Sequence, residues 1–273
     1  MMIEYSARSH IGMVRENNED NLYVDGIILP LHTRERPFTI DGSTSSPAVF
    51  AVCDGMGGED DGEIASRLAV QKLLNFNERI KSAGSEQLEE AIQSYVNKAN
   101  EAIHAETSGT NKRTGTTLAL AVVSEHGIYC FNMGDSRIYA LQKGAFRKIT
   151  NDHTLVAEQT RNSSLTPNQV MSRKAGHKLT RCIGIGDILT VESYPPIIGT
   201  CRFLICSDGL TDMVDTAEIE NILCASKRTA DAANSLLTSA LNKGGKDNVT
   251  VIIADFKNSK VSFFRSLSKK LKG

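Results

Sequence analysis

The stretch Phe50-Ala51-Val52-Cys53-Asp54-Gly55-Met56-Gly57-Gly58 decides the fold of this chain. An apolar run, typical of a buried strand, ends in an aspartate, and a glycine-rich turn follows at once. Glycine permits backbone conformations closed to other residues and lets another group approach the backbone closely. The stretch therefore predicts a strand that delivers the carboxylate of Asp54, and a bare carbonyl beside it, to one edge of a sheet.

A glycine-rich turn can also bind a phosphate, but that function needs a lysine or a helix N-terminus free of acids. Acidic side chains follow this turn instead, namely Glu59, Asp60, Asp61 and Glu63. Such a turn would repel a phosphate unless a cation lay between them. The composition of the turn therefore argues for a cation site and against a simple phosphate loop.

The same arrangement recurs along the chain. Asp135 and Asp208 follow apolar runs, Asp247 precedes one, and the pair Glu19 and Asp20 precedes another. One aspartate at a strand end is usually a turn residue, but five acidic strand ends predict carboxylates that converge on one edge. Packed carboxylates cannot all stay ionised without a counter-cation. Because the candidate ligands are all oxygen, we expect a hard cation, Mg²⁺ or Mn²⁺, rather than zinc.

The composition is that of a globular protein. The 273 residues are 40% hydrophobic and 23% charged, and the net charge is −1. No Pro/Ser/Gly-rich linker divides the chain, so we expect one large domain. The near-zero net charge argues against a nucleic-acid-binding protein. No signal-peptide core, membrane-spanning segment or Cys-x-x-Cys pattern is present, which predicts a cytoplasmic protein with reduced cysteines.

The order of elements predicts the fold class. Residues 2–7 are expected to form an edge strand, 22–29 a strand pair, and 30–47, rich in turn formers, an exposed insertion. Two amphipathic helices are expected over 64–80 and 88–103, strands over 116–123, 128–132, 137–141, 189–194, 202–206 and 249–254, and a later helix over 232–241. Short turns between consecutive strands imply antiparallel sheets, and paired helices would cover their outer faces. This predicts an α+β layered sandwich.

Residues 150–187 show no strand pattern, and the part from Gln159 to Gly186 is basic and contains no acid. Long irregular segments in compact domains are often binding loops or lids. We therefore treat Arg173, Lys174 and Lys178 as candidate substrate-binding residues of a mobile flap. An ordinary solvated loop is the alternative.

The chain ends in a basic tail over residues 257–273, with apolar residues near one helical face at Val261, Phe264, Leu267 and Leu271. Such a segment can lie on an anionic membrane, dock on an acidic partner, or pack on its own domain. The sequence leaves these three alternatives open. It predicts only that the tail is dispensable for catalysis.

Six short motifs occur in order along the chain. They are Arg15-x-x-x-Glu19-Asp20, Asp54-Gly55-Met56-Gly57-Gly58, Gly115-Thr116-Thr117, Gly134-Asp135-Ser136-Arg137, Ser207-Asp208-Gly209-Leu210 and Lys246-Asp247-Asn248-Val249. Together they resemble the metal-dependent serine/threonine protein phosphatases, the PPM or type-2C family, in its compact bacterial form. The resemblance implies a four-layer αββα sandwich of two antiparallel sheets flanked by helix pairs. It would occupy residues 1–256, followed by the tail at 257–273.

The resemblance also implies a role for each site residue. Asp54 would bridge two ions of Mn²⁺ or Mg²⁺, Asp208 and Asp247 would complete the first metal site, and the Gly55 carbonyl would bind the second metal, with Glu19 and Asp20 holding its waters. Asp135 and Asp212, with Asp208, match the positions of a third metal site. Arg15 would bind the substrate phosphate. Some family members carry a histidine that could protonate the leaving group where Met56 stands here.

The activity implied is hydrolysis of phosphoserine and phosphothreonine in proteins by a hydroxide held between the two metals, in opposition to a serine/threonine kinase. A monomer is expected. Two alternatives remain: a catalytically silent module of the same fold that binds or senses a ligand, and a phosphohydrolase of a non-protein substrate. The complete set of core acids, together with Arg15, favours an enzyme over the silent module.

Overall fold

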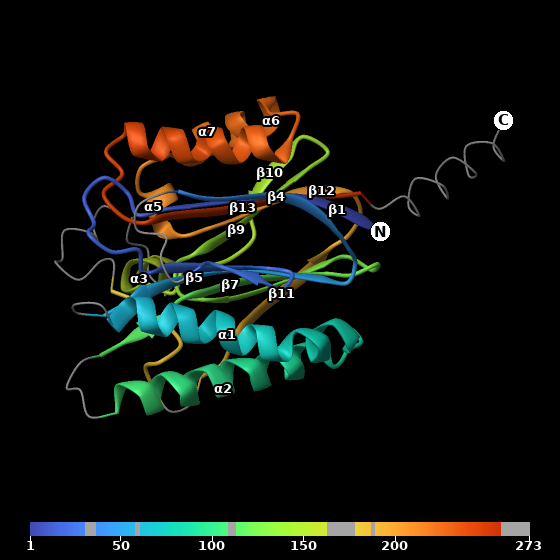
Figure 1. Ribbon diagram of the computed structural model, residues 1–273. Coiled ribbons are helices and arrows are strands. Elements are labelled where there is room, and N and C mark those ends of the chain that lie inside the picture. Colours follow the sequence, from blue (N-terminus) through green and yellow to red (C-terminus); the bar gives the residue numbers. More distant parts are fainter. Residues whose placement is uncertain (31–36, 58–60, 109–112, 163–177, 187–188, 258–273) are drawn as a thin grey trace.

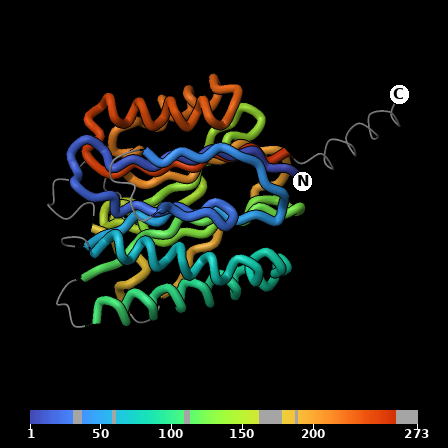
Figure 2. The backbone as a smooth tube through the Cα atoms, viewed as in Figure 1, coloured from blue at the N-terminus to red at the C-terminus, as the bar shows by residue number. Residues whose placement is uncertain are grey.

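The computed structural model describes residues 1–257 except 31–36, 58–60, 109–112, 163–177 and 187–188. Two antiparallel sheets face each other, and helices cover the outer face of each, so that the molecule has four layers (Figure 1). The predicted αββα sandwich is therefore present. The start of the first strand and the end of the last strand are paired, so both lie at the same end of the sandwich, as the tube in Figure 2 shows.

One sheet has the strand order β10-β9-β12-β13-β1-β4. Its strands are β1 (Met2–His10), β4 (Phe38–Ser45), β9 (Arg137–Gln142), β10 (Ala145–Lys148), β12 (Cys201–Cys206) and β13 (Val249–Phe256). The other sheet has the order β11-β8-β7-β5-β2-β3, with β6 paired to β5. Its strands are β2 (Asp20–Val24), β3 (Ile27–Ile28), β5 (Ala48–Met56), β6 (Gly115–Thr116), β7 (Leu118–Val123), β8 (Ile128–Met133) and β11 (Glu192–Ile197).

Two helix pairs cover the sheets. Helices α1 (Asp61–Ser82) and α2 (Leu88–Thr107) pack on the sheet of β5, and α6 (Thr216–Ala225) and α7 (Thr229–Asn242) pack on the sheet of β13. The short helices α3 (Leu155–Asn162) and α5 (Asp208–Thr211) lie at one end of the sandwich (Figure 1). The helical apolar stripes predicted from the sequence face the sheets, because burial of those stripes is what stabilises helices of this length.

Strand β5 explains why its sequence is apolar without interruption. Phe50 and Val52 face the core between the sheets, whereas Ala51 and Cys53 face α1 and α2. Both faces of the strand are buried, which favours a continuous apolar run over an alternating one. Because side chains alternate along a strand, Asp54 shares the face of Phe50 and Val52 and points between the two sheets. This alternation places the carboxylate where residues of the opposite sheet can reach it.

The N-terminal half differs from expectation in three places. Residues 38–45, expected to belong to an exposed insertion, are mostly exposed but form strand β4. This strand pairs with β1, so that β1 is an inner strand and not an edge strand. The sequence hides β4 because turn-forming Asp, Gly, Ser and Thr residues fill it, and only the pairing with β1 makes it a strand. Strand β5 continues past Asp54 to Met56, because β6 pairs with its last two residues.

Two further differences concern the C-terminal half. Helix α3 lies within the segment expected to be irregular. Strand β11 runs from Glu192 to Ile197, later than the predicted 189–194, and includes Pro195 and Pro196. It is an edge strand with a register shift between Tyr194 and Ile197, a place where proline is tolerated. Among the described residues, no helix is long and apolar enough to cross a membrane.

Candidate active site

Five aspartates from both sheets gather at one end of the sandwich and form what we term the acid edge: Asp20, Asp54, Asp135, Asp208 and Asp247. Asp20 and Asp54 are direct partners on neighbouring strands β2 and β5. Asp208 begins α5 directly after β12, and Asp247 lies just before β13, in the opposite sheet. The two sheets therefore supply carboxylates to the same space.

Burial and mutual repulsion dominate the electrostatics of the acid edge. Burial, followed by the nearby charges of Asp20 and Asp208, raises the pKa of Asp54 well above its usual value. Burial raises the pKa of Asp20 to about 7, with Asp208 and Asp247 contributing. Burial and neighbouring carboxylates likewise raise the pKa of Asp135 to about 7 and that of Asp208 to about 6. These carboxylates lack enough positive charge among the protein's own groups.

The backbone of Asp54 is fixed by two threonines of the Gly-Thr-Thr motif. The Thr117 N–H and the Thr116 hydroxyl both donate to the Asp54 carbonyl, at 2.8 and 2.9 Å. The Asp54 N–H donates in turn to Thr117 Oγ1 at 2.9 Å. Both backbone polar groups of Asp54 are thus satisfied, which leaves its side chain to face the other acids in one orientation. The sequence identified this motif but assigned it no role.

Gly55 occupies a position where no larger residue fits. A Cβ on Gly55 would lie 2.1 Å from the carbonyl oxygen of Gly62, at the start of α1, and 2.7 Å from that of Glu19. The Gly55 N–H donates to the Glu19 carbonyl at 3.1 Å. A Cβ on Gly62 would meet the Glu19 carboxylate, at 2.8 Å from its Cδ. The glycines therefore allow Glu19 and the first turn of α1 to close around the end of β5.

Asn248 connects three segments at the acid edge. Its Nδ2 donates to the carbonyls of Ile11 and Asn17, each at 2.8 Å, and its Oδ1 accepts the Glu19 N–H at 2.7 Å. The loop that carries Arg15 is held in this way to the start of β13. Sequence reasoning missed this role, although the position of Asn248 between Asp247 and an apolar strand was visible.

Arg15 reaches the acid edge from the loop between β1 and β2. Its Nη2 donates to Asp247 Oδ2 at 2.6 Å, and the two side chains are 51% and 35% exposed. The same loop is anchored by the Met13 N–H, which donates to the Gly245 carbonyl at 2.7 Å. Arg15 is thus a cation in direct contact with the acid edge, and it is exposed enough to turn toward a ligand.

Asp212 stands one helical turn after Asp208, because its N–H donates to the Asp208 carbonyl at 2.8 Å. The charge of Asp212 contributes to the raised pKa of Asp208, and the charge of Asp208 to that of Asp135. The three residues expected at a third metal site therefore influence one another in pairs, Asp212 with Asp208 and Asp208 with Asp135. Asp212 is exposed, so this group opens toward solvent.

The donor set fits a hard divalent cation. Asp20 Oδ2 accepts from the Ser207 hydroxyl at 2.7 Å, whereas Asp20 Oδ1 is buried without a hydrogen-bond partner in the described part of the chain. An unpaired buried carboxylate oxygen costs several kcal/mol unless a cation compensates it. Among the described residues, no three His, Cys, Asp or Glu side chains already form a compact ligand cluster. The carboxylates nevertheless raise one another's pKa values, and Arg15 takes up one oxygen of Asp247 in this structure.

The candidate flap is only partly within the described residues. Arg173 and Lys174 lie outside them. Lys178 is exposed, and its carbonyl accepts the Leu155 N–H of α3 at 3.0 Å. The described end of this basic segment is therefore attached to the same end of the sandwich as α3. The flap itself stays a prediction.

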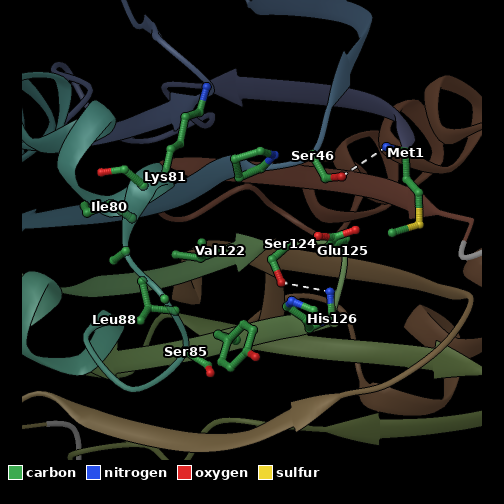
Figure 3. Close-up of a pocket in the computed structure, with 15 residues that line it drawn as sticks. Met1, Ser46, Ile80, Lys81, Ser85, Leu88, Val122, Ser124, Glu125 and His126 are labelled. Atoms are coloured by element: carbon green, nitrogen blue, oxygen red, sulfur yellow. Dashed lines mark hydrogen bonds between the residues drawn. The ribbon is translucent and has the colours of Figure 1, made fainter.

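A cavity of about 610 Å³ lies at the opposite end of the sandwich, which we term the far end. It is bordered by residues that include Met1, Ser46, Lys81, Ser124 and His126 (Figure 3). None of the five acid-edge aspartates lines it. The cavity and the carboxylates with raised pKa values therefore lie at different ends of the molecule.

Comparison with known proteins is consistent with the geometry. A family model described as Protein phosphatase 2C matches residues 40–243. The serine/threonine phosphatase stp of Listeria innocua is 32% identical over 252 residues, which are 91% of this chain and 94% of that protein. A crystal structure of the Mycobacterium tuberculosis serine/threonine phosphatase PstP is 30% identical and covers 94% of this chain and 100% of its own, with a TM-score of 0.77. The PstP catalytic domain in complex with two manganese ions is also 30% identical, covers 93% and 99%, and has a TM-score of 0.74.

Proposed function

This chain belongs to the protein phosphatase 2C family, and from that premise we propose that it removes phosphate from phosphoserine and phosphothreonine of proteins at the acid edge. The observation that carries this proposal is the uncompensated charge of the buried aspartates, in particular the unpaired oxygen of Asp20. A site with that imbalance needs cations. A silent binding module would have no reason to retain it.

The cofactor is Mn²⁺ or Mg²⁺. We propose that Asp54, Asp208, Asp247, the Gly55 carbonyl, Glu19 and Asp20 hold two ions, and that Asp135 and Asp212 hold a third together with Asp208. When bound, such ions lower the pKa of water to near neutrality and neutralise charge on phosphoryl oxygens. The all-oxygen donor set supports this assignment.

The chain's own residues would bind and orient the phosphoryl group. The Arg15 guanidinium, which donates to Asp247 in this structure, has the planar geometry to donate two hydrogen bonds to phosphoryl oxygens. Once a cation neutralises Asp247, Arg15 loses its partner and can turn to the substrate. The hydrogen bonds that the Asp54 backbone makes with Thr116 and Thr117 keep this residue in place, so positioning and electrostatics would supply most of the catalysis.

The cysteines give no support to a phosphocysteine route. Cys206 lies directly before the acid-edge segment that begins at Ser207, yet it is fully buried, and burial raises its pKa to about 12. Burial also raises the pKa of Cys182 to about 11. Because the thiolate is the nucleophile, a thiol held neutral cannot attack phosphorus at physiological pH. The reaction we propose therefore passes through no phosphoenzyme formed on these cysteines.

The substrates are phosphorylated proteins, and we propose that a serine/threonine kinase produces them. We also propose that the chain works as a monomer, since one chain supplies every residue assigned to the acid edge. The basic flap with Arg173, Lys174 and Lys178 would bind the protein around the phosphate. The tail at 257–273 would lie outside the catalytic domain at 1–256, free for contact with an anionic membrane.

The experiment is phosphate release from phosphoserine and phosphothreonine peptides with and without Mn²⁺, for the wild type and Asp54→Asn. We expect release only with metal and only in the wild type. Activity that survives EDTA, or an Asp54→Asn variant with wild-type kcat, would refute the assignment. Faster turnover of a small non-protein phosphoester than of every phosphopeptide would favour the non-protein phosphohydrolase instead.

A further inference from the structure

His153 is a buried histidine that the proposed reaction does not use. Its side chain is 0% exposed, and it lies between the turn that carries Asp135 and the described end of the basic segment. Its backbone N–H donates to the Gly134 carbonyl at 2.9 Å, and its own carbonyl accepts the Thr180 N–H at 2.8 Å. The residue thus joins two segments that border the acid edge.

The side-chain contacts of His153 define its tautomer. The Gly134 N–H lies 3.1 Å from His153 Nδ1. A backbone N–H can only donate, so Nδ1 must carry a lone pair, and the single proton of the neutral ring must be on Nε2. Burial lowers the pKa of His153, partly opposed by Glu192, which agrees with a neutral ring. The ring is therefore an acceptor toward Gly134 and a donor on its other side.

Glu192 of strand β11 holds this tautomer in place. Its Oε2 accepts from His153 Nε2 at 2.5 Å, while its Oε1 accepts from Asn151 Nδ2 at 3.0 Å. Burial would raise the pKa of Glu192, but its hydrogen bonds from His153, Asn151 and Tyr194 outweigh burial and lower it. A carboxylate that accepts from Nε2 keeps the proton there and leaves Nδ1 free to accept. Glu192, His153 and Gly134 thus form one hydrogen-bonded chain.

Gly134 is the residue on which this chain acts. It has a φ of +107°, a conformation that favours glycine, and it directly precedes Asp135. Its N–H donates to His153 Nδ1, while its carbonyl accepts from the His153 N–H and, at 3.1 Å, from Asn132 Nδ2. Both backbone groups are thus fixed, which sets the direction in which the chain enters Asp135.

We propose that His153, kept in its Nε2–H tautomer by Glu192, is a positioning residue for Asp135. It fixes the Gly134 turn so that the Asp135 carboxylate faces Asp208, and it thereby determines how well the third cation site closes. This inference rests on the proposed function for the role of Asp135. It adds residues outside the acid edge that control that site without touching substrate or metal.

Two substitutions that each keep one half of the arrangement test this role. In His153→Asn, the side-chain oxygen lies near the position of Nδ1 and can accept from Gly134, but contact with Glu192 is lost. In His153→Gln, the longer side chain can still meet Glu192 but presents no acceptor to the Gly134 N–H. Both variants lose the imidazole ring. If the ring only fills space in the core, Mn²⁺ affinity and kcat should fall by similar factors in both variants.

We expect His153→Gln to weaken the weakest Mn²⁺-binding step in titration calorimetry by about tenfold and to lower kcat for para-nitrophenyl phosphate by a similar factor. KM should not change, because the grip on phosphate belongs to Arg15. His153→Asn should stay close to the wild type in both measurements. The double variant Asp135→Asn/His153→Gln should be no worse than Asp135→Asn alone, since His153 acts through Asp135.

Equal losses of Mn²⁺ affinity and kcat in His153→Asn and His153→Gln would overturn the proposal. So would a double variant whose fold-loss equals the product of the fold-losses of Asp135→Asn and His153→Gln. The imidazole ¹⁵N spectrum gives a readout independent of activity: Nδ1 of His153 should be unprotonated, and a protonated Nδ1 would contradict the proposal. His126→Asn, at the far end, is the matched histidine control. Wild-type protein that binds Mn²⁺ but releases no phosphate would refute the proposed function, while the calorimetric comparison would still decide the role of His153.

Discussion

The two ends of the sandwich handle charge in opposite ways. At the far end, Lys81 Nζ lies 2.6 Å from Asp25 Oδ1, with the two side chains 20% and 11% exposed, and the amino group of Met1 donates to Ser46 Oγ at 3.1 Å. Figure 3 shows the Met1 amino group and Ser46 on one side of the cavity and Lys81 on another. At the acid edge, five carboxylates meet the guanidinium of Arg15, which donates to Asp247, and the charge of Arg137, which acts on Asp135 and Asp208. Lys81 and Asp25 thus form a pair at the far end, whereas the aspartates of the acid edge keep raised pKa values despite the nearby cations.

The difference shows which property identifies a reactive site. A large pocket is usually the first hypothesis for a binding site, and here it would select the far end. Buried carboxylates with raised pKa values select the acid edge, since a protein keeps such unfavourable groups together only where a ligand compensates them.

The largest effect is expected from Asp208→Asn. The substitution removes a ligand charge from the acid edge, and we expect kcat for a phosphothreonine peptide to fall by roughly 10³-fold or more, because metal positioning supplies most of the rate. Lys81→Met at the far end breaks a buried ion pair and should lower stability yet leave kcat unchanged. Steady-state kinetics on both variants, at a temperature where both are folded, checks the contrast. A large kcat loss in Lys81→Met would contradict it.

Stability in the absence of metal should show the imbalance directly. The pKa of Asp20 is raised to about 7 in the folded state, whereas in an unfolded chain an aspartate titrates near 3.9. Between these values the folded state binds more protons, so the Asp20 contribution to the unfolding free energy is largest at low pH and is lost as pH rises toward 7. In EDTA, the wild type should therefore lose unfolding free energy between pH 5 and pH 8 that Asp20→Asn keeps. The difference in unfolding free energy between the two proteins should shift in favour of the variant by on the order of 2 kcal/mol over this range.

Urea unfolding at the two pH values measures this gain. Glu4→Gln is the control, because Glu4 is 52% exposed and lies at the far end near Lys257. Its difference from the wild type should be nearly independent of pH. If the difference in unfolding free energy between Asp20→Asn and the wild type also proved independent of pH, the pKa of Asp20 would not be raised in the folded state.

The sequence predicted the acid edge because its signal is local. Each aspartate stands at one end of an apolar run that is expected to form a strand. In the antiparallel sheets, these strand ends lie at the same end of the sandwich. The helices α1, α2 and α7 were equally visible, since their apolar spacing is local too. The elements that the sequence predicts are those whose apolar spacing can be recognised within one short window, although their stabilising contacts are made with distant strands.

What the sequence did not predict depends on partners far away in the chain. Strand β4 has few apolar residues and exists because β1 pairs with it. The roles of Asn248 and His153 rest on hydrogen bonds to backbone groups of segments 19 or more residues distant. The ion pair of Arg15 with Asp247 joins residues 232 positions apart. No periodicity or motif spacing encodes such contacts.

A smaller effect is expected from Arg15→Ala, which removes the guanidinium that donates to Asp247 at the acid edge. KM for a phosphopeptide should rise about tenfold, since a charge-assisted bidentate contact is lost, and kcat should fall as well. Mn²⁺ affinity should not weaken, because Asp247 loses a competing partner. Arg15→Lys should recover only part of the loss, as an ammonium group lacks the planar fork. An unchanged KM, measured with saturating Mn²⁺, would remove Arg15 from the site.

The smallest effect is expected at the other extreme of the molecule. Strand β13 ends at Phe256, which pairs with Ile3 at the far end, so the last described residues lie away from the acid edge. A chain that ends at Phe256 should therefore keep the wild-type kcat and KM for para-nitrophenyl phosphate. If the tail binds anionic membranes, the full chain should sediment with anionic vesicles and the shortened chain should not. Loss of solubility or of activity on the small ester would show instead that the tail belongs to the fold, and the contrast between a reactive and an inert end would no longer hold.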